Sequence, residues 1–87
     1  MIFTESRVFS RRPEEYLDDE GLRALQNALI ENPFAGVEIR DTGGLRKLRW
    51  GIPGHGKRGG IRIIYAPILS VPIIHLVMMY QSSPHAW

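Results

Sequence analysis

The segment that most constrains the fold lies between residues 43 and 66, where two strand-like runs flank a glycine-rich stretch. Side chains alternate between the two faces of a strand, so Lys47 and Arg49 fall on one face of the run over residues 45–50. Arg46, Leu48 and Trp50 fall on the other face, and burial of Leu48 and Trp50 would present the two bases side by side. The second run covers residues 61–66. We therefore predict a β-hairpin with one basic face.

Three further segments have strand character. Residues 2–9 are rich in β-branched and aromatic side chains, and residues 37–40 alternate in the manner of a lead-in segment or a short edge strand. Residues 73–80 are almost wholly apolar, which favours a central strand covered on both faces. Pro67 cannot donate a ladder hydrogen bond and is expected to end the strand before it.

Two helices are predicted before the hairpin. Ser10 can cap a brief helix that ends near Leu17. Asp18 or Asp19 can cap a longer amphipathic helix, which Asn32 ends because proline follows it. The apolar stripe of that helix recurs at positions i, i+3 and i+7 (Leu22, Leu25 and Leu29). The predicted class is α+β: an N-terminal strand, two helices, then an antiparallel sheet, in the order β-α-α-β-β-β.

Length and composition narrow the setting. The 87 residues are expected to form a single domain, residues 1–87, and the absence of cysteine removes disulfides and favours a reducing compartment. The first residues do not resemble a signal peptide. The longest apolar stretch, residues 71–79, is interrupted by Pro72 and His75 and is too short to span a bilayer. We expect a cytoplasmic protein that does not enter a membrane.

Charge is divided sharply along the chain. All nine acidic residues lie in residues 1–41, which carry a net charge of −4, whereas residues 42–87 carry six bases and no acid. An uncompensated basic half indicates a polyanionic partner such as a nucleic acid. The alternative is a solvated face that the acidic half balances in the fold.

The sequence contains no complete P-loop or histidine-based metal motif. Residues 51–57 have nearly the glycine and lysine spacing of a P-loop, but Arg58 stands where Ser or Thr would bind magnesium, and a strand-like run follows instead of a helix. The three histidines (His55, His75 and His85) are at least ten residues apart and have no acid near them in sequence, so no metal site is expected. His75 is better explained as a partly buried structural residue. We expect neither a metal nor another cofactor.

The remaining chemistry belongs to a set of cations. Cleavage of RNA without a metal requires removal of a proton from the 2′-hydroxyl, charge stabilisation at the phosphorane, and protonation of the leaving oxygen. Lys47, Arg49 and Arg62 could stabilise the charge, and a lysine crowded by arginines could take the proton. Further phosphate contacts are assigned to bases in or near the loop (Arg46, His55, Lys57 and Arg58). The alternative is phosphate contact without catalysis.

Two motifs, Gly-Leu-Arg-Lys-Leu-Arg-Trp-Gly and Gly-Lys-Arg-Gly-Gly-Ile-Arg-Ile-Ile-Tyr, resemble the RelE/ParE toxin superfamily, most closely its HigB-like branch. Lys47 and Arg49 match the alternating basic pair of the family's second strand, Arg62 matches its third-strand arginine, and Lys57 and Arg58 match the loop bases of the branch. The resemblance implies an mRNA interferase of a type II toxin-antitoxin system, an endoribonuclease that cuts translated mRNA on the ribosome and inhibits translation. It also implies a cognate antitoxin, often with a helix-turn-helix domain.

The resemblance weakens after Tyr80. Relatives continue with a basic residue and a further helix, whereas Tyr80 here leads into Gln-Ser-Ser-Pro-His-Ala-Trp. Two interpretations stay open: a shortened or decayed toxin that only binds RNA or antitoxin, or an active enzyme in which His85 transfers the proton, as the ordinary pKa of histidine allows. The gyrase-poisoning activity of the ParE branch is a third, less favoured alternative, since the loop and strand residues are of the HigB type.

Overall fold

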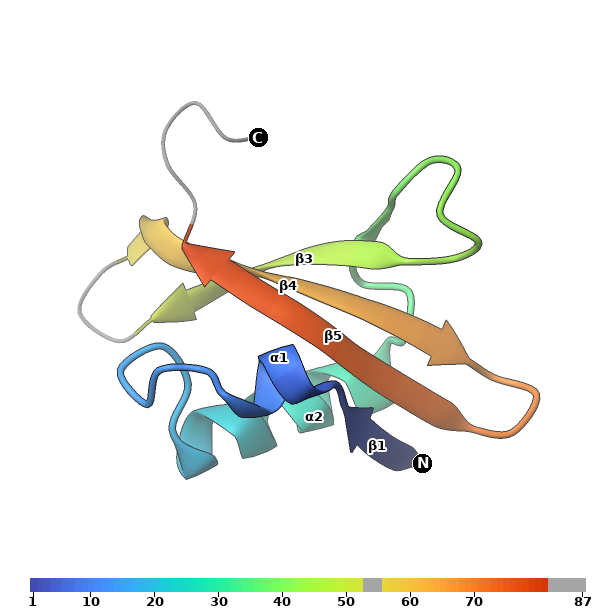
Figure 1. Ribbon diagram of the computed structural model, residues 1–87, viewed down its shortest axis with the longest axis horizontal. Coiled ribbons are helices and arrows are strands. Elements are labelled where there is room, and N and C mark those ends of the chain that lie inside the picture. Colours follow the sequence, from blue (N-terminus) through green and yellow to red (C-terminus); the bar gives the residue numbers. More distant parts are fainter. Residues whose placement is uncertain (53–55, 82–87) are drawn as a thin grey trace.

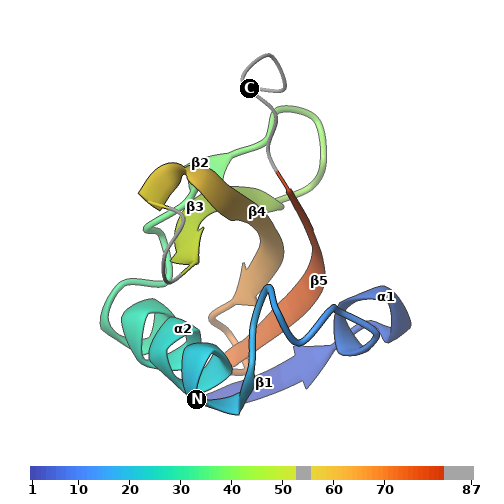
Figure 2. The ribbon, with the colours of Figure 1, turned by 90° about the vertical axis from the view of Figure 1, so that its left-hand side faces the viewer.

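The computed structural model describes residues 1–52 and 56–81, with the side chains of residues 52–59 excepted. Within these residues the chain forms two helices and a five-stranded sheet, which confirms the α+β class. In chain order the elements are β1 (Ile2–Glu5), α1 (Arg7–Ser10), α2 (Asp19–Glu31), β2 (Val37–Glu38), β3 (Arg46–Ile52), β4 (Gly56–Ile68) and β5 (Ile73–Gln81). The long helix α2 lies against one face of the sheet, and the short α1 follows β1 beside β5 (Figures 1 and 2).

The sheet is mixed. Its strand order is β1-β5-β4-β3-β2, and β2 to β5 form an antiparallel meander. The N-terminal strand pairs in parallel with the last one, from Ile2 opposite Ile73 to Glu5 opposite Leu76. Parallel neighbours need a long connection between them, and here the whole intervening chain provides it. The first and last strands are thus joined into one scaffold.

The N-terminal region differs from the prediction. The strand ends at Glu5, because the Ser6 hydroxyl accepts a hydrogen bond from the Phe9 amide at 3.0 Å and caps the single turn of α1. The turn carries Phe9, which is completely buried, into the core. The helix expected after Ser10 is wrong, since residues 14–16 form a turn.

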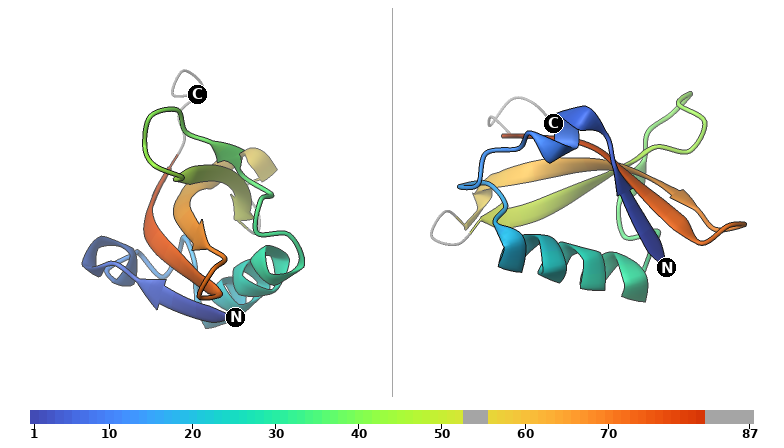
Figure 3. Two further views of the ribbon diagram at one scale, coloured as in Figure 1. Left: turned by 90° about the vertical axis from the view of Figure 1, so that its right-hand side faces the viewer. Right: turned by 60° about the horizontal axis from the view of Figure 1, so that its bottom comes forward.

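The long helix agrees with the prediction. The Asp18 carboxylate accepts a hydrogen bond from the Gly21 amide at 2.8 Å, and Asn32 is the C-cap. Leu25 and Leu29 are completely buried against the sheet, and Leu22 is partly buried at the edge of the core. Figure 3 shows α2 running along the underside of the strands.

The central strand is β4, not β5 as expected. Its residues 61–65 are buried on both faces, whereas β5 lies second from the edge and buries only Ile74 and Leu76. Pro67 does not end β4, which continues to Ile68. Pro67 pairs with Ile74 close to the end of the ladder, beyond the register shift at Ile64/Tyr65. The hairpin ladder also continues to the pair Ile52 and Gly56, so the expected loop is shorter than its glycines suggested.

A buried tyrosine ties the end of α2 to the sheet. Tyr65 is completely buried, its hydroxyl donates to the Pro33 carbonyl oxygen at 2.8 Å, and the Gly36 amide donates to the same hydroxyl at 2.9 Å. Gly36 lies so close to β3 that a Cβ atom there would be 2.8 Å from the Lys47 carbonyl oxygen. The link between helix and sheet therefore fixes the backbone at the start of the basic strand.

Candidate nucleic-acid interface

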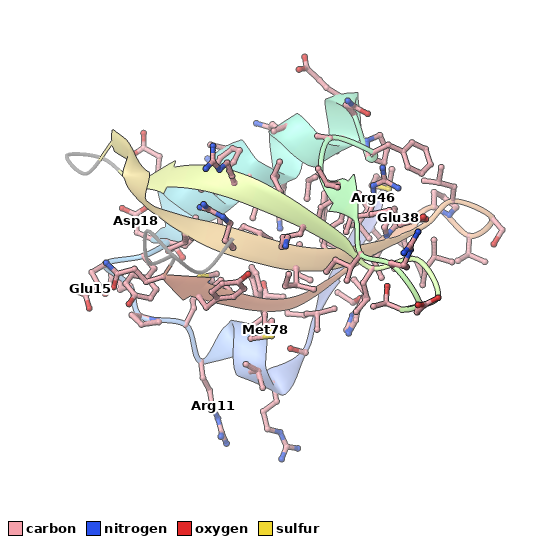
Figure 4. The ribbon with its side chains drawn as sticks, turned by 90° about the horizontal axis from the view of Figure 1, so that it is seen from above. Arg11, Glu15, Asp18, Glu38, Arg46 and Met78 are labelled. Atoms are coloured by element: carbon pink, nitrogen blue, oxygen red, sulfur yellow. The ribbon has the colours of Figure 1, made fainter. Side chains whose placement is uncertain are left out.

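The strand register brings the predicted cations to one face. Arg49 is the direct partner of Arg62 across β3 and β4, and Lys47 is the partner of Ile64 two pairs further along. Directly opposed residues point to the same side of a sheet. Lys47, Arg49 and Arg62 therefore share the face away from α2. Figure 4 looks onto this face, and neither α1 nor α2, the helices of the described residues, lies in front of β3, β4 or β5.

We call this surface the open face and define it by six residues of β3, β4 and β5 (Lys47, Arg49, Arg62, Ile64, Met78 and Tyr80). The three bases differ in exposure. Arg49 is exposed and Lys47 is half-buried, whereas Arg62 on the central strand is only 3% exposed, with its Nε and Nη1 atoms buried. Arg62 is buried within the sheet, whereas its cross-strand partner Arg49 is exposed to solvent.

The surroundings of Arg62 disfavour its positive charge. Burial lowers the pKa of its guanidinium, the positive charge of Arg49 lowers it further, and Tyr80 acts in the opposite direction. An arginine remains protonated at neutral pH in spite of such a shift. The open face therefore holds two arginine charges next to each other, and an anion bound there would relieve their repulsion.

Arg46 lies on the opposite face. It is the partner of Tyr65, its Nε donates to the Gly36 carbonyl oxygen at 2.8 Å, and its guanidinium stacks 5.0 Å from the centre of the Phe34 ring. This differs from its assignment as a nucleic-acid contact. The guanidinium secures the segment that precedes β2, because its hydrogen bonds are to that backbone.

Several other predicted residues fall outside the described part of the chain. This holds for His55, for His85, and for the side chains of Lys57 and Arg58, although the backbone of these two bases belongs to β4. His75 is described and is half-buried, with Nδ1 2.7 Å from the Thr4 hydroxyl. Its position between β1 and β5 agrees with the structural role expected of it.

Tyr80 was not among the site residues predicted from the sequence. It is the direct partner of Arg62 across β4 and β5, so its phenol lies on the open face beside the arginines. Met78, the partner of Ile64, lies on the same face. Alternation along β5 puts Met78 and Tyr80 on one side of that strand, but only the pairing with β4, which contains a register shift, shows that this is the side of Arg62. A hydroxyl next to a cation pair can donate a hydrogen bond to a phosphate oxygen or exchange a proton with it.

Within residues 1–52 and 56–81, no group of three or more potential metal-ligating side chains comes together. Over the same residues, neither helix has the length and apolar character needed to cross a membrane. No protein-family model matches this chain. The function is therefore inferred from the geometry of the open face and from the sequence motifs.

Proposed function

We propose that this protein is a ribosome-dependent endoribonuclease, the toxin of a type II toxin-antitoxin system of the RelE/ParE superfamily and HigB-like branch. It would act in the cytoplasm, cut translated mRNA and be neutralised by a cognate antitoxin, which we expect to carry a helix-turn-helix domain. The observation that supports the proposal most is the convergence of Lys47, Arg49 and Arg62 on the open face.

The open face suits a phosphate chain. Arg49 offers an exposed guanidinium that can pair with a phosphate through two parallel hydrogen bonds. Its cross-strand partner Arg62 is fixed by its burial, so the charge of Arg62 needs little reorganisation when a negative transition state forms. In this scheme the two arginines stabilise the phosphorane.

Proton transfer falls to the other polar groups of the open face. Lys47 and Tyr80 are the described candidates, since the six residues of this face include no carboxylate and no imidazole. Lys47 would accept the proton of the 2′-hydroxyl, and Tyr80 would donate to the leaving 5′-oxygen. His85, which lies outside the described residues, stays a candidate for the second step.

The direct test is induced expression followed by mapping of mRNA ends in a reconstituted translation reaction. The wild-type chain is expected to arrest growth and to produce cuts that require ribosomes, and Lys47→Ala with Arg49→Ala is expected to abolish both. Arg46→Ala removes a charge from the opposite face and is the matched control. Growth arrest that survives the double substitution would contradict the proposal.

A second candidate is a module that binds RNA or antitoxin without cutting. The six residues that define the open face, all from the described part of the chain, include neither a carboxylate nor an imidazole, the commonest proton carriers, and this favours the second candidate. This candidate predicts salt-sensitive binding to RNA and no cleavage on ribosomes. A helix-turn-helix protein encoded next to this gene, whose co-expression restored growth, would favour the toxin instead.

A further inference from the structure

A pocket of about 660 Å³ lies on the α2 side of the sheet, away from the open face. The turn before α2, the first turns of α2 and the end of β3 line it, and one side is open to solvent. Pockets that hold ligands have volumes of roughly 300 to 1,000 Å³, so this one has a suitable size. Its position on the other side of the sheet makes it a second site, independent of RNA contact.

The pocket has an apolar wall and an acidic one. Trp50, Tyr16 and Leu17 give it an apolar wall. Four acidic residues also line it (Glu14, Glu15, Asp18 and Glu20). Figure 4 shows Glu15 and Asp18 at one end of the molecule and Arg46 with Glu38 at the other.

Arg12, the described base closest in sequence before the pocket residues, does not neutralise the negative charge of the pocket. Arg12 donates to the Leu17 carbonyl oxygen at 3.3 Å, but its guanidinium also meets the Glu5 carboxylate at 3.0 Å, so that charge is already compensated. Arg11 points away from the sheet (Figure 4). Among the described residues that line the pocket, none is a lysine or an arginine.

We propose that this pocket binds a protein segment in which lysine or arginine alternates with an apolar side chain. The apolar side chain would pack against Trp50, and the cation would lie among the glutamates or over an aromatic ring. RNA is excluded by charge repulsion. The four acidic residues are exposed, so an acidic segment would be repelled by them, and a purely apolar segment would cover them without supplying a counter-charge, which is costly. Charge complementarity thus selects a basic peptide.

The test uses the full chain carrying Trp87→Phe, so that Trp50, which lines the pocket, is its only tryptophan. The probe is an acetylated, amidated hexapeptide of alternating leucine and arginine, titrated while the tryptophan fluorescence is measured. The comparison peptides replace arginine by glutamine or by glutamate. Amide NMR shifts of Gly21, Ala24 and Gly51 give a second readout at the pocket.

The expected result is a saturable fluorescence change with the arginine peptide and shifts at the three pocket amides. The triple variant Glu14→Gln, Glu15→Gln and Glu20→Gln should weaken binding about tenfold or more, as removal of close charge pairs does. A matched variant removes three charges elsewhere (Glu31→Gln, Glu38→Gln and Asp41→Asn) and should bind as the parent does.

Three outcomes would overturn the proposal. The first is no saturable change with the arginine peptide, and the second is equal binding of the glutamine peptide, which would mean an apolar pocket without charge selection. The third is equal weakening by both triple variants, which would mean attraction to overall charge. Each is distinct from failure of the RNA proposal, because the titration contains no nucleic acid and leaves the open face unchanged.

Discussion

Tyr65 and Gly36, 29 residues apart in sequence, are joined by a buried hydrogen bond in which the Gly36 amide donates to the tyrosine hydroxyl at 2.9 Å. The hydroxyl itself donates to the Pro33 carbonyl oxygen at 2.8 Å. A single phenol therefore satisfies two backbone groups of the segment between α2 and β2.

Removal of that hydroxyl is expected to destabilise the fold. Tyr65→Phe would leave the Gly36 amide and the Pro33 carbonyl without this partner, at a cost of about 1 to 3 kcal/mol in the free energy of unfolding. Urea denaturation followed by circular dichroism measures it. Tyr16→Phe is the control, because the Tyr16 hydroxyl bonds to the exposed Gln81 side chain at 3.1 Å. Equal destabilisation by both variants would contradict the assignment.

Gly36→Ala tests the close approach of the same segment to β3. The added Cβ would lie 2.8 Å from the Lys47 carbonyl oxygen and 3.0 Å from the Tyr65 ring, neither of which can move without disturbing the sheet. We expect a decrease of about 1 to 3 kcal/mol in the free energy of unfolding, as in other overpacked sites. A Cβ at Gly51 would meet no atom of the described residues within 4 Å, so Gly51→Ala should change the free energy of unfolding little. Thermal unfolding of both variants measures the difference, and equal stability of the two would contradict the close approach at Gly36.

Arg62→Met should separate stability from function. The pKa of Arg62 is lowered by burial and by Arg49, so folding disfavours its charged form. This cost to folding stability is fully present at pH values below the lowered pKa, which include neutral pH, and it disappears only in strong alkali. Methionine, which is unbranched and uncharged, fills the inner part of the same space and removes the cost. The urea midpoint at pH 7 should stay equal or rise, whereas RNA binding should fall. A clearly lower midpoint would show that the interactions of the arginine outweigh its burial.

Salt dependence of RNA binding can distinguish the two faces of the sheet. Removing one cation that binds a phosphate of a single strand should reduce the slope of log affinity against log salt by about 0.7. Lys47→Ala and Arg49→Ala should each show this reduction in filter-binding or anisotropy titrations. Arg46→Ala removes the same charge from the opposite face and should retain the parent slope, although without its bond to Gly36 the fold is less stable. An identical slope for all three variants would argue against the open face as the RNA-binding surface.

Local signals in the sequence were sufficient for parts of the fold. An aspartate cap at position 18 or 19, the leucine stripe and Asn32 before a proline predict the two ends and the buried side of α2, and in the structure Asp18 is the cap. The alternation of Lys47 and Arg49 was also enough to place both bases on one face, because strand geometry leaves no other choice.

Features that depend on distant pairing could not be predicted in this way. The composition of β5 indicated a central strand, but the parallel pairing with β1 and the central place of β4 arise from the whole sheet. The burial of Arg62 and its position beside Tyr80 likewise require the β4–β5 register. The single turn of α1 depends on Ser6 and on a core position for Phe9, and neither is evident in a strand-like run.

The parallel pairing of β1 with β5 has a consequence for synthesis. Thr4 and His75, which meet in the finished sheet, are separated by 71 positions along the chain. While the protein is being made, its opening strand has no neighbour until the residues around His75 have emerged from the ribosome. The nascent polypeptide must therefore wait for its last strand before the sheet can close, as expected where contacts are far apart in sequence.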